Sequence, residues 1–180
     1  MGLRASHTAS LFFEDCRVPK ENVLGEVGAG FATAMRTLDI GRCGLGGSSL
    51  GAAKEAYELA LKYAIERQQF GRPIADFQAI QFKLADMSTR VAASRALLYA
   101  AAAAKDRGQP ITQFGSMSKL MASETAMWVT TQAIQIFGGY GYVKDYPVER
   151  LFRDAKVTEI YEGTSEIQRI VIARELYAKS

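Results

Sequence analysis

Three long stretches of apolar residues at helical spacing dominate this sequence, and short turns rich in glycine or proline separate them. Apolar side chains that recur every three to four residues form one face of a helix, so the pattern predicts helices over residues 30–69, 76–107 and 112–137. The turns are Phe70-Gly71-Arg72-Pro73 and Gly108-Gln109-Pro110, and glycine followed by proline typically ends a helix. Long helices joined by short connections favour an up-and-down antiparallel bundle.

Two shorter helices complete the predicted bundle. One has Pro147 in its first turn and ends near Lys156, since proline is well suited to the first turn of a helix. The other starts near Ser165 and runs to the C-terminus, and Ser165 and Gln168 have the spacing of a capping box. We therefore expect an all-α fold, with a four-helix bundle and an extra C-terminal helix.

The first 27 residues differ from the rest of the chain. Ser10–Val18 has the composition of a short strand, and Pro19 stops it. Because one strand is not stable alone, we interpret it as the remnant of a β domain that is missing here. The predicted domain boundary thus separates a remnant with its linker, residues 1–27, from a helical domain, residues 28–180.

The helical spacing also predicts which side chains face inward. In the first helix these are Leu50, Ala53, Tyr57, Leu61 and Ile65; in the second, Ile80, Leu84, Met87, Val91 and Leu98; in the third, Met117, Leu120, Met121, Met127, Trp128, Thr131 and Ile134.

The first half of the first helix is rich in glycine, and each glycine in a helix costs about 1 kcal/mol relative to alanine. Two explanations stay open. Another backbone or a flat ligand approaches closely, or the helix kinks or breaks near Gly46-Gly47.

Composition excludes several classes of protein. Apolar residues make up 48% of the chain, charged residues 23%, and the net charge is +3, so the chain is neither disordered nor a typical nucleic-acid binder. No apolar run reaches the length of a membrane span. Two cysteines outside any CxxC pair indicate a reducing compartment, and a single histidine argues against a metal site or a Ser-His triad. Any acid–base chemistry would therefore depend on a carboxylate.

The most informative motif is Ile160-Tyr161-Glu162-Gly163-Thr164-Ser165-Glu166-Ile167-Gln168-Arg169. Glu162 lies just before a predicted helix start, and Gly163 permits conformations closed to other residues and a close approach of a ligand. The free N–H groups of a helix start attract anionic groups. A carboxylate in an apolar pocket has a raised proton affinity, which suits a general base. The alternative is a loop glutamate followed by an ordinary helix cap.

Three further motifs each have a plain structural explanation and a functional one. The glycines of residues 135–142 are a helix C-cap or a phosphate cradle. Arg67 is a favourable charge at a helix C-terminus or a pyrophosphate ligand. Asp39 and Arg42 are a helix-surface ion pair, or Arg42 and its neighbours line an acyl pocket.

In combination, the motifs at 67–71, 135–141, 153–156 and 160–169 resemble the C-terminal region of the acyl-CoA dehydrogenases, and residues 13–19 resemble the exit from that family's middle β domain. The resemblance implies dehydrogenation of an acyl-CoA to a trans-2-enoyl-CoA, with FAD as the hydride acceptor. It assigns the catalytic base to Glu162. Some relatives carry their base on the first helix, where this chain has Gly41.

The resemblance also implies a set of binding residues. The substrate contacts are Asp39, Ile40, Gly41, Arg42 and Gly163. The FAD contacts are Arg67, Gln78, Gln135, Ile136, Phe137, Gly138, Gly139, Thr164, Ser165 and Glu166, and no metal is implied. The flavin would be shared across a subunit interface.

The implied partners are an acyl-CoA, an electron-transfer flavoprotein and further copies of the chain in a tetramer built from dimers, with neither nucleic acid nor membrane. The implied compartment is the cytoplasm of a bacterium or the mitochondrial matrix of a eukaryote. Residues 38–42 and 158–160 resemble the short-chain members. Because most of two domains is missing, we expect a fragment or isolated C-terminal domain with weak FAD binding and poor turnover.

Two alternatives remain at this level. Flavin monooxygenases share the bundle, but Glu162 argues against them. A non-enzymatic helical oligomerisation domain is the other alternative, and the missing domains favour it.

Overall fold

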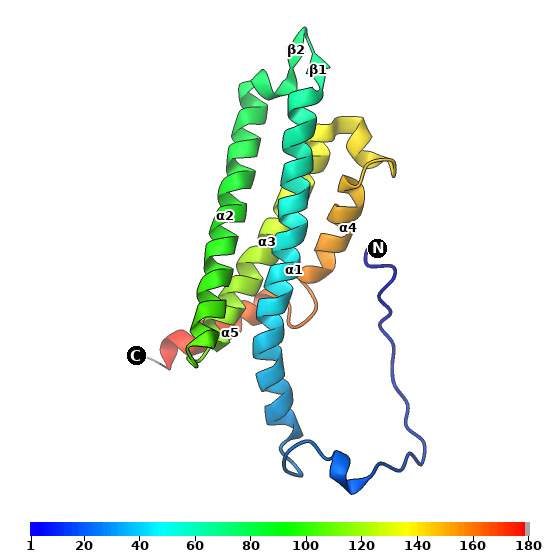
Figure 1. The fold of residues 1–180 in the computed structure, drawn as a ribbon, viewed down its shortest axis with the longest axis vertical. Coiled ribbons are helices and arrows are strands. Elements are labelled where there is room, and N and C mark those ends of the chain that lie inside the picture. The colour runs from blue at the N-terminus through cyan, green and yellow to red at the C-terminus, as the bar shows by residue number, and fades with distance from the viewer. Residues whose placement is uncertain (179–180) are drawn as a thin grey trace.

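A computed structural model describes residues 1–178 and shows a bundle of helices from which the N-terminal segment curves away (Figure 1). Its α-helices are α1 (Gly30–Glu66), α2 (Gln78–Asp106), α3 (Thr112–Phe137), α4 (Val148–Thr158) and α5 (Ser165–Tyr177). A two-stranded antiparallel hairpin, β1 (Gln68–Gln69) and β2 (Arg72–Pro73), connects α1 to α2. The 3-10 helices are η1 (Lys20–Asn22), η2 (Ile74–Asp76) and η3 (Gly138–Tyr142).

The helices follow an up-and-down course. α1 and α2 run antiparallel on either side of the hairpin, α3 returns, α4 descends beside it, and α5 crosses the end of the bundle opposite the hairpin (Figure 1). α3 contacts α1, α2, α4 and α5, so it is the central helix. The predicted all-α bundle with an extra C-terminal helix is confirmed.

Small side chains fill the centre of the bundle. The face of α1 that packs inward carries four alanines that are 0% exposed, namely Ala53, Ala56, Ala60 and Ala64. Of the stripe predicted for α1, Leu50 is also buried and Tyr57 and Leu61 are half-buried. The stripe is wrong at Ile65, which is exposed near the end of the helix, where the buried position belongs to Ala64.

On α2 the predicted stripe is correct. Leu84, Met87 and Val91 are buried, and Ile80 and Leu98 are half-buried against the same core.

The inward stripe predicted for α3 is only partly correct. Trp128 and Ile134 are half-buried against the core, but Thr131 is exposed, and many of the fully buried positions belong to small residues such as Gly115, Ala122 and Ala126. The reason is close packing on several sides: a Cβ at Gly115 would lie 3.1 Å from the carbonyl oxygen of Asp39 on α1. A helix enclosed in this way buries small residues where its neighbours approach.

Close packing between helices also explains a glycine of α1. α1 is continuous through Gly46-Gly47, so the predicted alternative of a break is wrong. A Cβ at Gly46 would lie 3.4 Å from the carbonyl oxygen of Ser118 on α3. Close approach of another backbone therefore explains Gly46.

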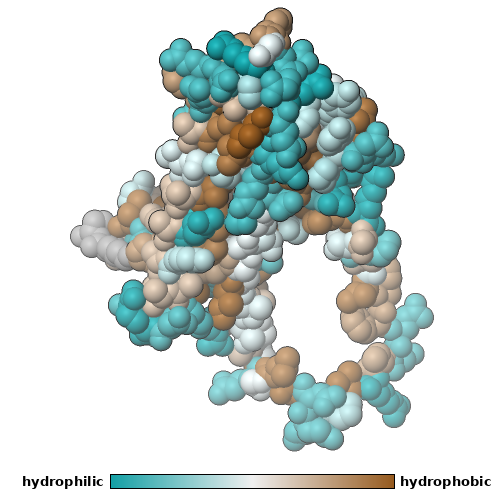
Figure 2. Space-filling model, turned by 45° about the horizontal axis from the view of Figure 1, so that its top comes forward, coloured by the Kyte–Doolittle hydropathy of each residue, from teal (hydrophilic) through white to brown (hydrophobic). Residues whose placement is uncertain are grey.

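The strand predicted over residues 10–18 is also wrong. Apart from η1, residues 1–29 form no helix or strand, and Leu11, Phe12 and Phe13 are exposed. The segment that loops out of the bundle shows hydrophobic patches on its surface (Figure 2). A strand needs a neighbour for its backbone hydrogen bonds, and none is available within residues 1–178. Only the first residues pack on the bundle, where the Leu3 N–H donates to Oδ1 of Asp154 on α4.

Other predicted boundaries shift by a few residues. α1 ends at Glu66 rather than Gln69, because the hairpin begins there, while α3 has the predicted bounds. α5 ends at Tyr177 with Ala178 as its C-cap, and the last two residues of its predicted course, residues 179–180, lie outside the described residues. Across residues 1–178, no helix has the length and apolar character needed to span a bilayer.

Candidate active site

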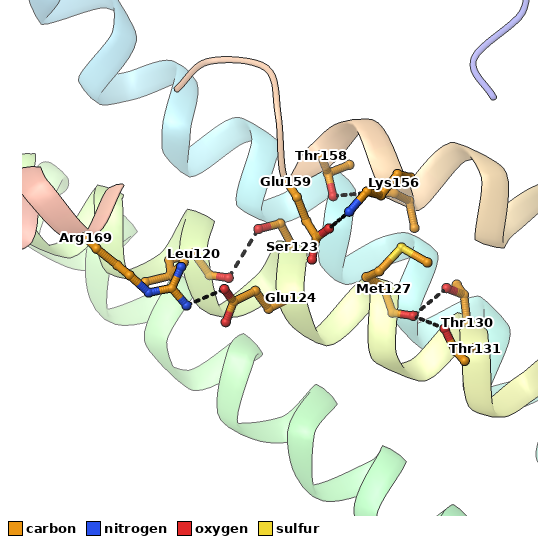
Figure 3. Close-up of polar contacts among 11 residues, drawn as sticks. Leu120, Ser123, Glu124, Met127, Thr130, Thr131, Lys156, Thr158, Glu159 and Arg169 are labelled. Atoms are coloured by element: carbon orange, nitrogen blue, oxygen red, sulfur yellow. Dashed lines mark hydrogen bonds and ion pairs between the residues drawn. The ribbon is translucent and has the colours of Figure 1, made fainter. Parts of the chain in front are cut away.

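The loop between α4 and α5, residues 159–164, carries the candidate base, and ion pairs hold the elements on both sides of it (Figure 3). At its start, Lys156 Nζ lies 2.6 Å from Oε2 of Glu159. Beyond the loop, Arg169 of α5 pairs with Glu124 of the central helix α3. These contacts attach both ends of the loop to the bundle.

Glu162 points its carboxylate at α1. A Cβ added to Gly41 would lie 2.6 Å from Oε2 of Glu162 and 3.2 Å from its Cδ, so the carboxylate occupies the space that any larger residue at position 41 would need. The side chain is exposed to solvent in this chain, and the apolar cover expected around it is not formed by residues 1–178. The backbone N–H of Glu162 donates no hydrogen bond within the described residues.

Two consecutive residues of the loop have positive φ, 52° at Glu162 and 92° at Gly163. A glutamate is uncommon in this left-handed region, whereas glycine enters it without strain. Gly163 is also required for space, because a Cβ there would lie 2.7 Å from Nε2 of Gln168.

Two buried side chains hold the carbonyl groups of this turn. Lys119 of α3 donates from Nζ to the Gly163 oxygen at 2.8 Å. Gln168 of α5 donates from Nε2 to the oxygens of Glu162 at 3.1 Å and Gly163 at 2.9 Å. The orientation of the peptides after Glu162 is therefore fixed from two helices.

A separate pocket of about 930 Å³ opens between the end of α1, the hairpin and the end of α3. Its aromatic wall contains Tyr63 and Phe137, whose rings stack with centroids 4.1 Å apart. Arg67 lies over the ring of Tyr140, 5.5 Å from its centroid. Burial raises the pKa of Tyr63. Aromatic walls and a guanidinium suit a planar, anionic ligand.

The glycines of this pocket divide by role. Gly138 is the C-cap of α3 with φ 61°, so the plain structural explanation accounts for it. A Cβ at Gly141 would lie 2.6 Å from the Ile134 oxygen, which excludes larger residues there. Gly139 borders open space and lines the pocket, so its backbone is accessible to a ligand.

Comparison with known proteins agrees with this geometry. Residues 28–177 match the family described as acyl-CoA dehydrogenase, C-terminal domain. The chain belongs to the acyl-CoA dehydrogenase family.

Similar proteins include a reductase and two dehydrogenases. The chain is 57% identical to the acryloyl-CoA reductase (NADH) of Anaerotignum propionicum, over 98% of this chain and 45% of that protein. It is 55% identical to the mitochondrial short-chain specific acyl-CoA dehydrogenase of Rattus norvegicus, over 98% of this chain and 43% of that protein. The structure of butyryl-CoA dehydrogenase from Megasphaera elsdenii superimposes with a TM-score of 0.90 at 52% identity, covering 92% of this chain and 43% of that one. The chain thus spans less than half the length of these curated relatives.

Of the substrate contacts expected from the acyl-CoA dehydrogenases, Gly41 and Gly163 lie beside Glu162, and Ile40 is exposed. Asp39 and Arg42 form an ion pair of 2.8 Å, as the plain explanation predicts, although Arg42 is buried rather than on the surface. Asp39 also accepts a hydrogen bond from the hydroxyl of Thr112 at 2.8 Å, so the pair joins α1 to α3.

The expected FAD contacts fall in several places. Arg67 and the run from Ile136 to Gly139 line the aromatic pocket. Gln78 is exposed at the first residue of α2, and Gln135 lines a different hollow beside α4. Thr164, Ser165 and Glu166 line a third, smaller pocket beside Glu124 and Glu159.

At this third pocket the predicted capping box is wrong. The N-cap of α5 is Thr164, whose hydroxyl accepts from the Ile167 N–H at 3.4 Å. Hydrogen bonding to its own backbone N–H and to Thr164 lowers the pKa of Glu166. The Gln168 side chain, expected to serve the cap, instead donates to the two loop carbonyls.

Sequence reasoning missed Lys119, the buried lysine that contacts the loop. It lies among apolar and small residues of the third helical stretch, between Met117 and Met121. A lysine within such a stretch is an unusual choice for a buried face, and that was the available signal.

Proposed function

We propose that this chain is the C-terminal FAD- and substrate-binding part of an acyl-CoA dehydrogenase, with Glu162 as the base that removes the α proton of an acyl-CoA thioester. Membership of the family supports the reaction class. The single observation that carries the assignment is the contact of the Glu162 carboxylate with Gly41, where a residue without a side chain leaves space for it.

In the proposed reaction, the carboxylate and the backbone N–H of Glu162 have different roles. The Glu162 carboxylate would accept the α proton and become a carboxylic acid, and FAD, when bound, would supply the acceptor for the hydride of the β carbon. The unpaired N–H of Glu162 is free to donate to the thioester oxygen, which gains negative charge as the proton leaves.

The residues present fit FAD. The pocket of Arg67, Tyr63 and Phe137 has room for part of a planar ligand, a guanidinium for a pyrophosphate and an accessible backbone at Gly139. When bound, FAD supplies the acceptor for the hydride. Because the expected contacts lie in several separate places on one chain, we propose that a flavin is shared between subunits, in a tetramer built from dimers.

The remaining assignments are further proposals. We propose a short-chain acyl-CoA as substrate, given the similarity to the short-chain specific and butyryl-CoA enzymes. An electron-transfer flavoprotein is proposed as acceptor, in the cytoplasm of a bacterium or a mitochondrial matrix. Residues 1–27 are proposed to be the end of a middle β domain and its linker, and residues 28–180 the helical domain.

The test is product analysis with a full-length flavoprotein that carries residues 1–180 as its C-terminal part. Incubation with acyl-CoAs of increasing length and an electron acceptor should give 2-enoyl-CoAs, with the highest kcat/KM at about four carbons. A yellow, folded protein that converts none of them would contradict the proposed function.

A second candidate is the reverse reaction, reduction of a 2-enoyl-CoA. The similarity to acryloyl-CoA reductase (NADH) favours it. In that direction the Glu162 carboxylic acid would return a proton to the α carbon. The same protein, supplied with NADH and acryloyl-CoA, would then oxidise NADH faster than it dehydrogenates propionyl-CoA.

A further inference from the structure

The turn that carries Glu162 has to be held by its surroundings. A non-glycine residue at φ 52° lies in a sparsely populated region, and such conformations persist where neighbouring groups over-determine them. The loop has one internal backbone bond across it, from the Ser165 N–H to the Glu159 oxygen at 2.9 Å. That bond closes the loop but does not orient the carbonyls of Glu162 and Gly163.

Those carbonyls are oriented by side chains that no solvent reaches. Lys119 and Gln168 are both 0% exposed, and both donate to the Gly163 oxygen. Since a carbonyl oxygen has two lone pairs, these two donors satisfy it and fix the plane of the peptide.

Supplying that hydrogen bond from Lys119 requires the burial of a charged ammonium group, which costs free energy. Within residues 1–178 no carboxylate lies within 4.0 Å of its Nζ, so the ammonium has no ion-pair partner. Burial of a charged group without a close counter-ion is costly, and a methionine would fill the same space at lower cost. Burial lowers the pKa of Lys119, while the charges of Glu159, Glu162 and Glu166 raise it.

We propose that Lys119 is a positioning residue for Glu162. By holding the Gly163 carbonyl against α3, it fixes the peptide between Gly163 and Thr164 and so keeps the turn in the conformation that directs the Glu162 carboxylate at Gly41. Gln168 is the second clamp on the turn. This inference rests on the proposed function of Glu162 as the base.

The first test is kinetic and uses the full-length flavoprotein with Lys119→Met. Loss of the clamp should lower kcat by about 10- to 100-fold, as expected for a misplaced catalytic group, with flavin content and KM within about twofold of wild type. The matched control is Lys83→Met, which removes a half-buried lysine on α2 that donates to Gln132 of α3, far along the chain from the loop. The control should retain the wild-type kcat.

The second test needs no activity. In the 180-residue chain, hydrogen–deuterium exchange of residues 160–165 should be at least about tenfold faster in Lys119→Met than in wild type, with the Ser165 amide included. Lys83→Met should leave that exchange unchanged. Equal exchange of the loop in all three proteins would overturn the proposal.

Three outcomes separate the two hypotheses. A wild-type enzyme that converts no acyl-CoA refutes the proposed function, whatever Lys119 does. A wild type that is active and a Lys119→Met variant with the same kcat refute the positioning role alone. If Lys119→Met does not fold, Gln168→Leu removes the other donor to the same carbonyl, and an unchanged kcat in that variant refutes the clamp.

Discussion

Gly41→Ala tests whether the Glu162 carboxylate works where the structure places it. The added Cβ would lie 2.6 Å from Oε2 of Glu162, and ordinary contact begins at 3.4 Å, so the carboxylate must withdraw by the difference, 0.8 Å. The atom that moves is the far end of a flexible, exposed side chain. The fold therefore accommodates the added methyl group easily, whereas the Glu162 carboxylate is displaced from its position beside residue 41.

Gly41→Ala should change stability and catalytic rate in opposite directions. Alanine is better than glycine within a helix by about 1 kcal/mol, so Gly41→Ala should raise the free energy of unfolding by roughly that amount. A displacement of about 1 Å at a reacting group costs up to roughly 100-fold in rate. We expect a more stable protein with kcat lowered by about 10- to 100-fold.

Chemical denaturation of the 180-residue chain measures the first effect, and turnover of the full-length flavoprotein with butyryl-CoA measures the second. Gly51→Ala is the matched control, because Gly51 lies on the same helix with open space around its Cβ position. It should gain similar stability without a loss of rate. If Gly41→Ala keeps the wild-type kcat, the carboxylate does not act from beside Gly41 and the reasoning is refuted.

Three further predictions concern packing, reactivity and pH. Met87→Ala should lower the free energy of unfolding by about 2–5 kcal/mol, because Met87 is 0% exposed in the core; denaturant melts would show it. Iodoacetamide should label exposed Cys16 before half-buried Cys43, since burial raises the pKa of the Cys43 thiol; peptide mass spectrometry distinguishes the two, and faster labelling of Cys43 would contradict this prediction. The hydrogen bond from Arg153 lowers the pKa of Glu149, so its contribution to stability is complete above the unfolded pKa of 4.5 and is lost as pH falls through the lower folded value. Glu149→Gln should therefore melt below wild type at pH 6, and the difference should shrink as the pH falls below 4.5.

The sequence predicted the helices well because their signals are local. Apolar spacing and the Gly-Gln-Pro turn set the bounds of α3, and the stripe of α2 that contains Met87 and Val91 was correct. The inward face predicted for α3 was only partly correct, because helical periodicity ranks residues by hydrophobicity and not by size. A central helix is instead selected for small volume, which depends on its neighbours.

The candidate site was predictable only in part. The motif around Glu162 identified the candidate base. The closeness of the Glu162 carboxylate to Gly41 could not be predicted, because it depends on the packing of α1 beside a loop that lies 121 residues away in the chain. The roles of Lys119 and Gln168 were not predictable from spacing, because each depends on a contact with a carbonyl of another element. A strand was predicted for residues 10–18 from composition alone, and composition does not supply the partner that a strand requires.

The most direct test of the account is anaerobic stopped-flow measurement of flavin reduction by butyryl-CoA in the full-length protein, comparing wild type with Glu162→Gln at equal flavin content. Glutamine keeps the size of the side chain and cannot accept the proton, so the account predicts a loss of about 100- to 10,000-fold in the reduction rate. Reduction of the flavin at the wild-type rate would show that another group removes the α proton.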